Sequence, residues 1–378
     1  MSNLIKNIES LALKRWPRVD NDRLQAWDAA DEYLLNHLQE SDGYRVEPGR
    51  TLIINDSHGA LATALNSLKP VSWSDSYIAH QSAAANVIDN KCEYPFQELA
   101  STDTPNGQFD LLLIKIPKTT ALLEDQLSRI RPLLHTNTRI VAAGMIKHLQ
   151  KSAFACLEKM IGPLTTSLAK KKARLLFPVF DSTLSVKSSP YPTIYTDADI
   201  PLPMSNHANV FSRDSLDHGA RFLMSQYNQL SEATQAVDLA CGNGVLGLMY
   251  QKRFPTSHMT YIDESYSAIA SASMNHATWF SDPKPSASFR VGNGLDKTES
   301  DSVELILCNP PFHQQHVVGD QVAMELFREA KCCLRQKGEL WIVANQHLGY
   351  SGKLKHLYGN CRIVATNKKF AVFKVVKR

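Results

Sequence analysis

Residues 236–247 read Ala236-Val237-Asp238-Leu239-Ala240-Cys241-Gly242-Asn243-Gly244-Val245-Leu246-Gly247, and this stretch decides the fold. Its first four residues are apolar around a single acid and predict a buried strand, and residues 245–253 have the composition of a helix. The glycines in between allow a tight turn and a close approach of the backbone to a ligand. A strand, a glycine turn and a helix in this order are typical of nucleotide-type cofactor sites.

The residues that follow alternate between strand and helix patterns. Strands are predicted at 259–262, 289–291, 305–308 and 340–344, and helices at 266–278 and 323–334. Such alternation predicts an α/β fold with a parallel sheet and helices on both faces. Residues 361–365 and 370–376 read as two further strands joined by the polar turn Thr366-Asn367-Lys368-Lys369, so the last pair is predicted to be antiparallel.

The N-terminal half repeats this order of motifs with weaker signals. Residues 51–56 with Gly59 resemble 236–247, and Asp75-Ser76-Tyr77 resembles Asp263-Glu264-Ser265. Residues 110–117 resemble 304–311, residues 139–143 resemble 339–344, and residues 170–173 resemble 367–370. The alignment pairs Asp75 with Asp263 and Lys115 with Asn309. It predicts a tandem duplication, with domains at 1–188 and 189–378 and a linker at about 181–205 that is rich in Pro, Ser and Thr.

Composition excludes several classes of protein. The chain has 378 residues, of which 43% are hydrophobic and 21% charged, and it contains no apolar run long enough to cross a membrane. Its N-terminus lacks the apolar core of a signal peptide, so a cytoplasmic location is expected. The seven cysteines form no Cys-x-x-Cys pair, which argues against a disulfide framework and against a zinc site, and no metal is expected.

Two basic stretches contain no acidic residue. Residues 159–180 include Lys170, Lys171, Lys172 and Arg174, and residues 340–378 include Lys368 and Lys369. Unneutralised cations in such stretches can contact the phosphates of a nucleic acid. The alternative is an ordinary solvated surface, because the net charge of the whole chain is only +4.

Asp238 distinguishes between two cofactors that a glycine turn can hold. A carboxylate beside the turn would oppose the doubly anionic pyrophosphate of NAD. S-adenosylmethionine has no phosphate and carries an ammonium and a sulfonium, so it is the predicted cofactor. Asp263 would accept hydrogen bonds from the ribose hydroxyls, and Asn293 would bond the adenine amino group unless it is only a turn residue before Gly294.

The residues Asn309-Pro310-Pro311-Phe312 follow directly after the apolar run 305–308. The Asn309 amide oxygen and the Pro310 carbonyl can accept hydrogen bonds from one amino group, and proline has no N–H that would compete. Phe312 offers a flat face on which a base can stack. This arrangement suits methyl transfer to an exocyclic amino group, whereas Cys308 is predicted to be a packed core residue.

The N-terminal half lacks this arrangement. Lys115 stands where Asn309 stands, and Lys118 where Phe312 stands. Lysine cannot accept a hydrogen bond from an amine. The first domain is therefore predicted to have kept the fold and lost catalysis.

Together these motifs give the chain a family resemblance. The second half resembles class I S-adenosylmethionine-dependent methyltransferases, whose fold is Rossmann-like, and the whole chain resembles the bacterial ribosomal RNA guanine-N2 methyltransferases. Those proteins join a degenerate methyltransferase-like domain to an active one. The resemblance extends to His313 and to residues 206–212 and 217–221, and it is strongest to the large-subunit (23S) members.

The resemblance implies the activity, the partner and further site residues. The chain would methylate the exocyclic N2 of a guanine in 23S ribosomal RNA, as a monomer whose degenerate domain grips the RNA. Phe211 and Gly219 would help to close the cofactor pocket, and Asn243 would bind the cofactor. His313 would contact RNA, and His316 would do so or shape the pocket, although both histidines also suit an ordinary surface loop.

Other functions stay open on the sequence alone. The acceptor could be a guanine of 16S RNA, the N6 of adenine in a nucleic acid, or a glutamine side chain, because the Pro-Pro motif is shared by enzymes that methylate these groups. A ribosome-assembly factor that binds RNA without catalysis is the non-enzymatic alternative. The intact Asp238, Gly242, Gly244 and Asn309 argue against it.

Overall fold

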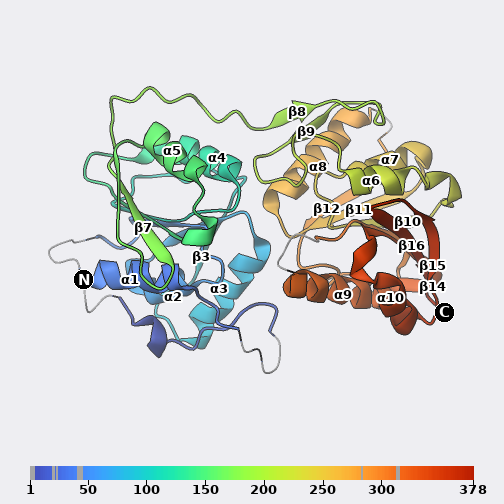
Figure 1. The fold of residues 1–378 in the computed structure, drawn as a ribbon, viewed down its shortest axis with the longest axis horizontal. Coiled ribbons are helices and arrows are strands. Elements are labelled where there is room, and N and C mark those ends of the chain that lie inside the picture. The colour runs from blue at the N-terminus through green and yellow to red at the C-terminus, as the bar shows by residue number, and fades with distance from the viewer. Residues whose placement is uncertain (1–4, 19–21, 23, 41–45, 282–283, 312–315) are drawn as a thin grey trace. The chain divides into compact units, whose positions relative to one another are not determined.

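The chain folds into two compact units, Met1–Tyr191 and Pro192–Arg378, close to the predicted boundary at residue 188. The computed structural model describes residues 5–18, 22, 24–40, 46–281, 284–311 and 316–378, without the side chains of 316–320. Each unit is an α/β fold built on a seven-stranded sheet (Figure 1).

The sheet of the second unit has the order β12-β11-β10-β13-β14-β16-β15. Its strands are β10 (Gln235–Leu239), β11 (His258–Asp263), β12 (Ala287–Val291), β13 (Val303–Cys308), β14 (Leu334–Asn345), β15 (Arg362–Thr366) and β16 (Phe370–Val376). The first five strands pair in parallel, while β16 is antiparallel to both β14 and β15. The predicted parallel sheet with an antiparallel C-terminal hairpin is therefore confirmed.

Helices cover both faces of this sheet. They are α6 (His218–Met224), α7 (Val245–Arg253), α8 (Tyr266–Trp279), α9 (His316–Cys333) and α10 (Tyr350–Tyr358). Leu223, Leu246 and Ala272 of the first three helices share one core cluster with Leu305 and Trp341. Phe327 of α9 and Leu354 of α10 pack in a second cluster on the opposite face. The sequence patterns did not predict α6 or α10.

The first unit has the same architecture, with the order β3-β2-β1-β4-β5-β7-β6. Its strands are β1 (Thr51–Ile54), β2 (Val71–Ser74), β3 (Gln97–Ala100), β4 (Leu111–Lys115), β5 (Arg139–Met145), β6 (Leu164–Thr166) and β7 (Ala173–Pro178). Its helices are α1 (Ala29–Glu40), α2 (Ala60–Ala64), α3 (Tyr77–Asp89), α4 (Thr120–Ile130) and α5 (Lys151–Met160). The two strand orders correspond one to one, as expected of a duplicated fold.

The correspondence extends to single side chains and corrects one predicted alignment. Ser76 caps α3 by accepting from Ala79 N, as Ser265 caps α8 by accepting from Ala268 N. Asp75 therefore matches Glu264, and the predicted pairing of Asp75 with Asp263 is wrong by one residue. The capping serines fix how the two helices align, whereas the sequence alone favours matching one acid with another.

The predicted linker is partly ordered structure. Ser189 and Tyr191 donate hydrogen bonds to Asp125 and Glu124 of α4, so they belong to the first unit. The short strands β8 (Thr193–Tyr195) and β9 (Met204–Asn206) pair antiparallel and belong to the second unit. The stretch at 181–205 is thus divided between the two units.

Candidate active site

The glycine turn of the second unit lies between β10 and α7, as predicted. Asp238, in β10, is fully buried, and its Oδ2 accepts a hydrogen bond of 2.8 Å from Gly247 N. Its Oδ1 has no hydrogen-bond partner among the described residues. Burial raises the pKa of Asp238 to about 8, and the nearby charge of Asp263 acts in the same direction. A cationic ligand would offset the cost of ionising this carboxyl group.

Gly242 leaves space for a ligand at the turn. Its φ of +54° is left-handed, and a Cβ added there would meet no heavy atom of the described residues within 4 Å. At Gly244, with φ +83°, a Cβ would lie 3.0 Å from the Cβ of Ala272, so this glycine lets α7 pack against α8. Gly242 is thus the glycine of this turn whose missing side chain a ligand could use.

Asp263 lies beside the turn at the end of β11. Its two carboxylate oxygens accept from Gly242 N at 2.9 Å and from Ser265 N at 3.0 Å. Its carbonyl accepts from Gly292 N at 3.0 Å, which brings the loop that contains Asn293 next to it. The structure therefore brings Asp238, Gly242, Asp263 and the Asn293 loop together at the carboxyl edge of the sheet.

A polar contact from α8, which the sequence did not predict, secures the turn. The side chain of Asn275 donates to the carbonyls of Asn243 at 3.1 Å and Ser205 at 3.0 Å, and it accepts from Ser205 N at 2.8 Å. Asn243 also donates to the Tyr195 hydroxyl at 3.4 Å. The turn is thereby tied to β8 and β9. An asparagine in an Ala-rich helix was the available signal, since Asn86 has the same place in α3.

Asn309 follows β13 directly and is half buried. Its Nδ2 donates a hydrogen bond of 2.9 Å to Oδ2 of Asp217, the residue that caps α6. The amide nitrogen is therefore engaged by the protein. Cys308 is fully buried, and burial raises the pKa of its thiol, which supports the predicted core role.

Gly219 lies on the side of Asn309, not at the glycine turn. A Cβ at Gly219 would lie 3.5 Å both from Asn309 Oδ1 and from the ring of Phe370. Phe211 is 55% exposed in the segment before α6. The predicted Phe312 and His313 lie outside the described residues, and of His316 only its place as the first residue of α9 is described.

An open pocket of about 730 Å³ lies next to these residues, between α6 and the turn that joins β15 to β16. Its lining includes the basic or titratable side chains His218, Lys368 and Lys369 and the apolar side chains Phe222, Met249 and Phe370. Lys368 and Lys369 are exposed. The pocket thus combines cations with aromatic faces beside Asn309.

In the first unit an internal cation occupies the corresponding position. Lys115 Nζ, at the end of β4, lies 2.7 Å from Asp28 Oδ1 and 2.5 Å from Asp31 Oδ1. Burial would lower the pKa of Lys115, but these two carboxylates raise it above its ordinary value. The ammonium and the acids therefore satisfy one another without a ligand.

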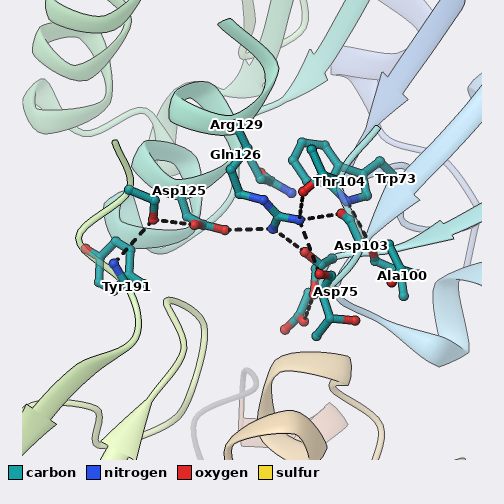
Figure 2. Close-up of polar contacts among 12 residues, drawn as sticks. Trp73, Asp75, Ala100, Asp103, Thr104, Asp125, Gln126, Arg129 and Tyr191 are labelled. Atoms are coloured by element: carbon teal, nitrogen blue, oxygen red, sulfur yellow. Dashed lines mark hydrogen bonds and ion pairs between the residues drawn. The ribbon is translucent and has the colours of Figure 1, made fainter. Parts of the chain in front are cut away.

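In the loop after β3, a cation of the protein itself again takes up the hydrogen-bond acceptors (Figure 2). The guanidinium of Arg129 in α4 lies 5.0 Å from the centre of the Trp73 ring. It donates to the carbonyls of Ser101 and Asp103 and, at 3.0 Å, to Thr104 Oγ1. In the second unit Glu329 of α9 holds the matching loop by accepting from Leu295 N at 2.7 Å.

The basic cluster of the first unit is partly neutralised in space. Lys171 pairs with Glu32 at 2.6 Å, and Lys170 lies over the ring of Tyr33. Lys172 is exposed, whereas Arg174 is half buried. The prediction of an unneutralised stretch was therefore only partly right, because an acid far away in sequence reaches Lys171.

Comparisons with known proteins agree with this architecture. Residues 1–182 match a family model described as RLMG N-terminal domain, and residues 201–374 match one described as methyltransferase small domain. A protein of Ectopseudomonas mendocina named ribosomal RNA large subunit methyltransferase G is 46% identical over 97% of this chain and 98% of its own length. The chain belongs to the ribosomal RNA large subunit methyltransferase G family.

Other similar proteins support the same family and fold. A relative with the same name from Aeromonas salmonicida is 43% identical over 97% of both chains. Among solved structures, the T. thermophilus 16S rRNA N2 methyltransferase RsmC, in complex with AdoMet and guanosine, superposes with a TM-score of 0.76. It covers 97% of this chain and 95% of its own at 16% identity, and so it shows the shared fold.

S-adenosylmethionine is the cofactor that fits the site of this family member. Asp238 offers a buried oxygen to which no described residue donates, and Gly242 leaves open space at the turn. Among the described residues, no group of three or more His, Cys, Asp or Glu side chains is arranged to hold a metal ion. In the same part of the chain, no helix is both long and apolar enough to cross a bilayer.

Proposed function

We propose that this chain transfers a methyl group from S-adenosylmethionine to the exocyclic N2 of a guanine in large-subunit ribosomal RNA. The single observation that carries the proposal is the place of Asn309, which follows β13 at the carboxyl edge of the sheet, next to the end of β10 where the glycine turn begins. The names of the family members supply the RNA class, and the RsmC complex with guanosine supplies the base by analogy.

Asn309 and Pro310 would hold the amino group that reacts. S-adenosylmethionine supplies an electrophilic methyl group on a sulfonium. An aromatic amine is a weak nucleophile, because its lone pair is delocalised into the ring. Acceptors at Asn309 Oδ1 and the Pro310 carbonyl would take both N–H groups and favour a pyramidal nitrogen, so the gain is in positioning and electrostatics. We assign no general base, because the nitrogen becomes acidic only once it is methylated.

The pocket between α6 and the β15–β16 turn would receive the RNA strand beside the target. Its aromatic side chains suit stacking of unpaired bases, and Lys368 and Lys369 suit contacts to phosphates. The target base would leave its stack to reach Asn309. The first unit would position the RNA through Lys170, Lys172 and Arg174, without cofactor chemistry of its own. We further propose that the protein works as a cytoplasmic monomer.

The chemistry is tested with the purified chain, labelled S-adenosylmethionine, and protein-free 23S and 16S RNA. Nucleoside mass spectrometry should find N2-methylguanosine in the 23S RNA. Asn309→Ala should lose at least ~100-fold in rate, as expected when an electrostatic contact to the reacting group is removed. Its affinity for S-adenosylmethionine should stay within about twofold, and Asn137→Ala, at an exposed asparagine of the first unit, is the control.

The same assay separates the alternatives. Label in 16S RNA or in N6-methyladenosine would show that the RNA or the base differs from the one proposed. Label in glutamine-containing peptides would show that the substrate is a protein.

RNA contacts are tested by the salt dependence of binding. The double variant Lys368→Met, Lys369→Met should reduce the steepness of the plot of log binding constant against log salt concentration. The reduction should be about 0.7 to 0.9 for each phosphate that the protein no longer neutralises. Lys187→Met, at an exposed lysine in the first unit, should leave the slope unchanged.

A further inference from the structure

The hydrogen bond between Asn309 and Asp217 joins two segments that are far apart in the sequence. Asn309 Nδ2 lies 2.9 Å from Asp217 Oδ2, and the same oxygen accepts from Ala220 N at 2.8 Å as the cap of α6. Asp217 is therefore held in place by the helix that it caps. It is fixed before any ligand reaches Asn309.

The carboxylate of Asp217 determines which way the Asn309 amide points. A carboxylate can only accept hydrogen bonds, so Asn309 must turn its NH₂ group toward it. The reverse orientation would place the Asn309 oxygen against the Asp217 oxygen, two acceptors without a proton between them. The amide oxygen is therefore left as the group that can meet a substrate, and it can bind only a donor such as an amino group.

The first unit has the same contact with a different outcome. Asp28 caps α1 by accepting from Ala30 N at 2.9 Å, and its Oδ1 accepts from Lys115 Nζ at 2.7 Å. Lys115 takes the place of Asn309, as the strand registers show. The acid at the helix cap is thus present in both units, but only Asn309 has an acceptor left over.

Gly219 is needed for this geometry. A Cβ at residue 219 would lie 2.9 Å from Asp217 Oδ2, closer than ordinary van der Waals contact allows. The same Cβ would lie 3.5 Å from Asn309 Oδ1. The absence of a side chain at this position therefore lets Asp217 approach Asn309 and keeps the amide oxygen accessible.

We propose that Asp217 is a positioning residue, which orients the Asn309 amide so that its oxygen accepts from the amino group of the substrate. This role rests on the proposed function. Asp217 selects an exocyclic amine over a carbonyl at this position, and it acts on the methyl-transfer step through Asn309. It makes no contribution to the affinity for S-adenosylmethionine.

The experiment separates helix capping from orientation. In Asp217→Ser the hydroxyl can still cap α6, but it is too short to reach Asn309, whereas in Asp217→Asn the amide oxygen can still accept from both partners. Asp217→Ser should lower kcat on 23S RNA roughly 10- to 100-fold, the worth of one hydrogen bond to a charged group. Asp217→Asn should stay within about threefold of the unaltered protein, and the S-adenosylmethionine affinity should stay within about twofold in both.

Ser76→Ala is the matched control, because it removes a helix cap in the first unit where no catalysis is proposed. It should lower the melting temperature through the lost cap and leave kcat unchanged. A double-mutant cycle gives a second readout. In an Asn309→Ala background, followed by single-turnover kinetics, Asp217→Ser should have no further effect on the rate.

Two results would overturn the proposal. One is a kcat for Asp217→Ser within about twofold of the unaltered protein, and the other is an effect of Asp217→Ser that is equally large with and without Asn309. Both require an unaltered protein that methylates guanosine. Failure of the unaltered protein to methylate any guanosine would instead refute the proposed function, so the two failures are distinguishable.

Discussion

At the scale of single residues, Gly242 and Gly244 have different tasks although they share a turn. Gly244 lies against Ala272, whereas the space beside Gly242 is open. The spacing of the glycines in the sequence could not separate these tasks, because both residues have a left-handed φ. Only the packing of α8 against the turn distinguishes them.

We expect Gly242→Ala to abolish cofactor binding with a small effect on folding. A left-handed alanine costs about 1–2 kcal/mol, and the methyl group would enter the space left for the ligand. Isothermal titration with S-adenosylmethionine and urea unfolding measure the two effects. Gly359→Ala is the control, since Gly359 has a φ of +75° and open space but ends α10. Wild-type affinity in Gly242→Ala would contradict the assignment.

Asp238 should make cofactor binding depend on pH. Its pKa of about 8 lies above the ordinary value of 3.8, so at pH 7 most of the free protein carries the protonated acid. A bound cation favours the carboxylate, and binding should then release a proton. The affinity for S-adenosylmethionine should rise by up to ~10-fold per pH unit below pH 8. Calorimetry in buffers of different ionisation enthalpy would measure the proton release.

The raised pKa of Asp238 also affects the stability of the free protein, which should fall as pH rises. A carboxyl group whose pKa is raised on folding contributes stability below its unfolded pKa, and this contribution is lost as pH rises toward 8. Asp238→Asn should remove this loss and should also flatten the pH dependence of cofactor binding. An Asp238→Asn variant with an unchanged pH profile would show that another group titrates.

At the scale of elements, the end of the fourth strand of each sheet contacts the start of the helix that precedes the first strand, and this contact has two forms. In the second unit β13 meets α6 through Asn309 and Asp217, and in the first unit β4 meets α1 through Lys115 and Asp28. The sequence alone predicts that Lys115 replaces Asn309. It does not reveal the acid at the helix cap, because that partner lies far away in sequence.

We expect Lys115→Met to destabilise the first unit strongly. It would leave Asp28 and the buried Asp31 without their cation, and breaking a buried ion pair costs about 3–5 kcal/mol. Urea unfolding followed by tryptophan fluorescence would measure this change. Lys118→Met, at an exposed lysine of the same loop, should change the free energy of unfolding by less than ~0.5 kcal/mol. A loss below about 1 kcal/mol in Lys115→Met would show that the ion pair is dispensable.

At the scale of the whole molecule, each unit has core clusters of its own on both faces of its sheet. Each should therefore fold without the other. The proposed division of labour assigns the cofactor to the second unit and assigns RNA positioning to both. It follows that binding of the cofactor and binding of RNA should separate when the chain is divided.

The chain divided at Tyr191 tests this division of labour. Residues 192–378 should fold and bind S-adenosylmethionine like the full chain, but their RNA affinity should fall by at least ~10-fold, because linked binding modules reinforce one another. Residues 1–191 should fold and show no S-adenosylmethionine binding, since Lys115 and Arg129 fill the corresponding positions. Calorimetry and filter binding measure the two affinities. Cofactor binding by residues 1–191 would contradict the loss of this site.

The amino-acid sequence by itself determined the alternation of strands and helices, the duplication, the glycine turn and the Asn-Pro-Pro motif. These are local signals, because hydrophobic period and turn chemistry act over a few neighbouring residues. The tertiary structure alone decided the one-residue shift that pairs Asp75 with Glu264, the contact of Asn275 with the turn, the neutralisation of Lys171 by Glu32, and the orientation of Asn309 by Asp217. Each of these depends on two segments that meet only when the sheet has formed, and spacing along the chain carries no information about which side chains then come within hydrogen-bonding distance.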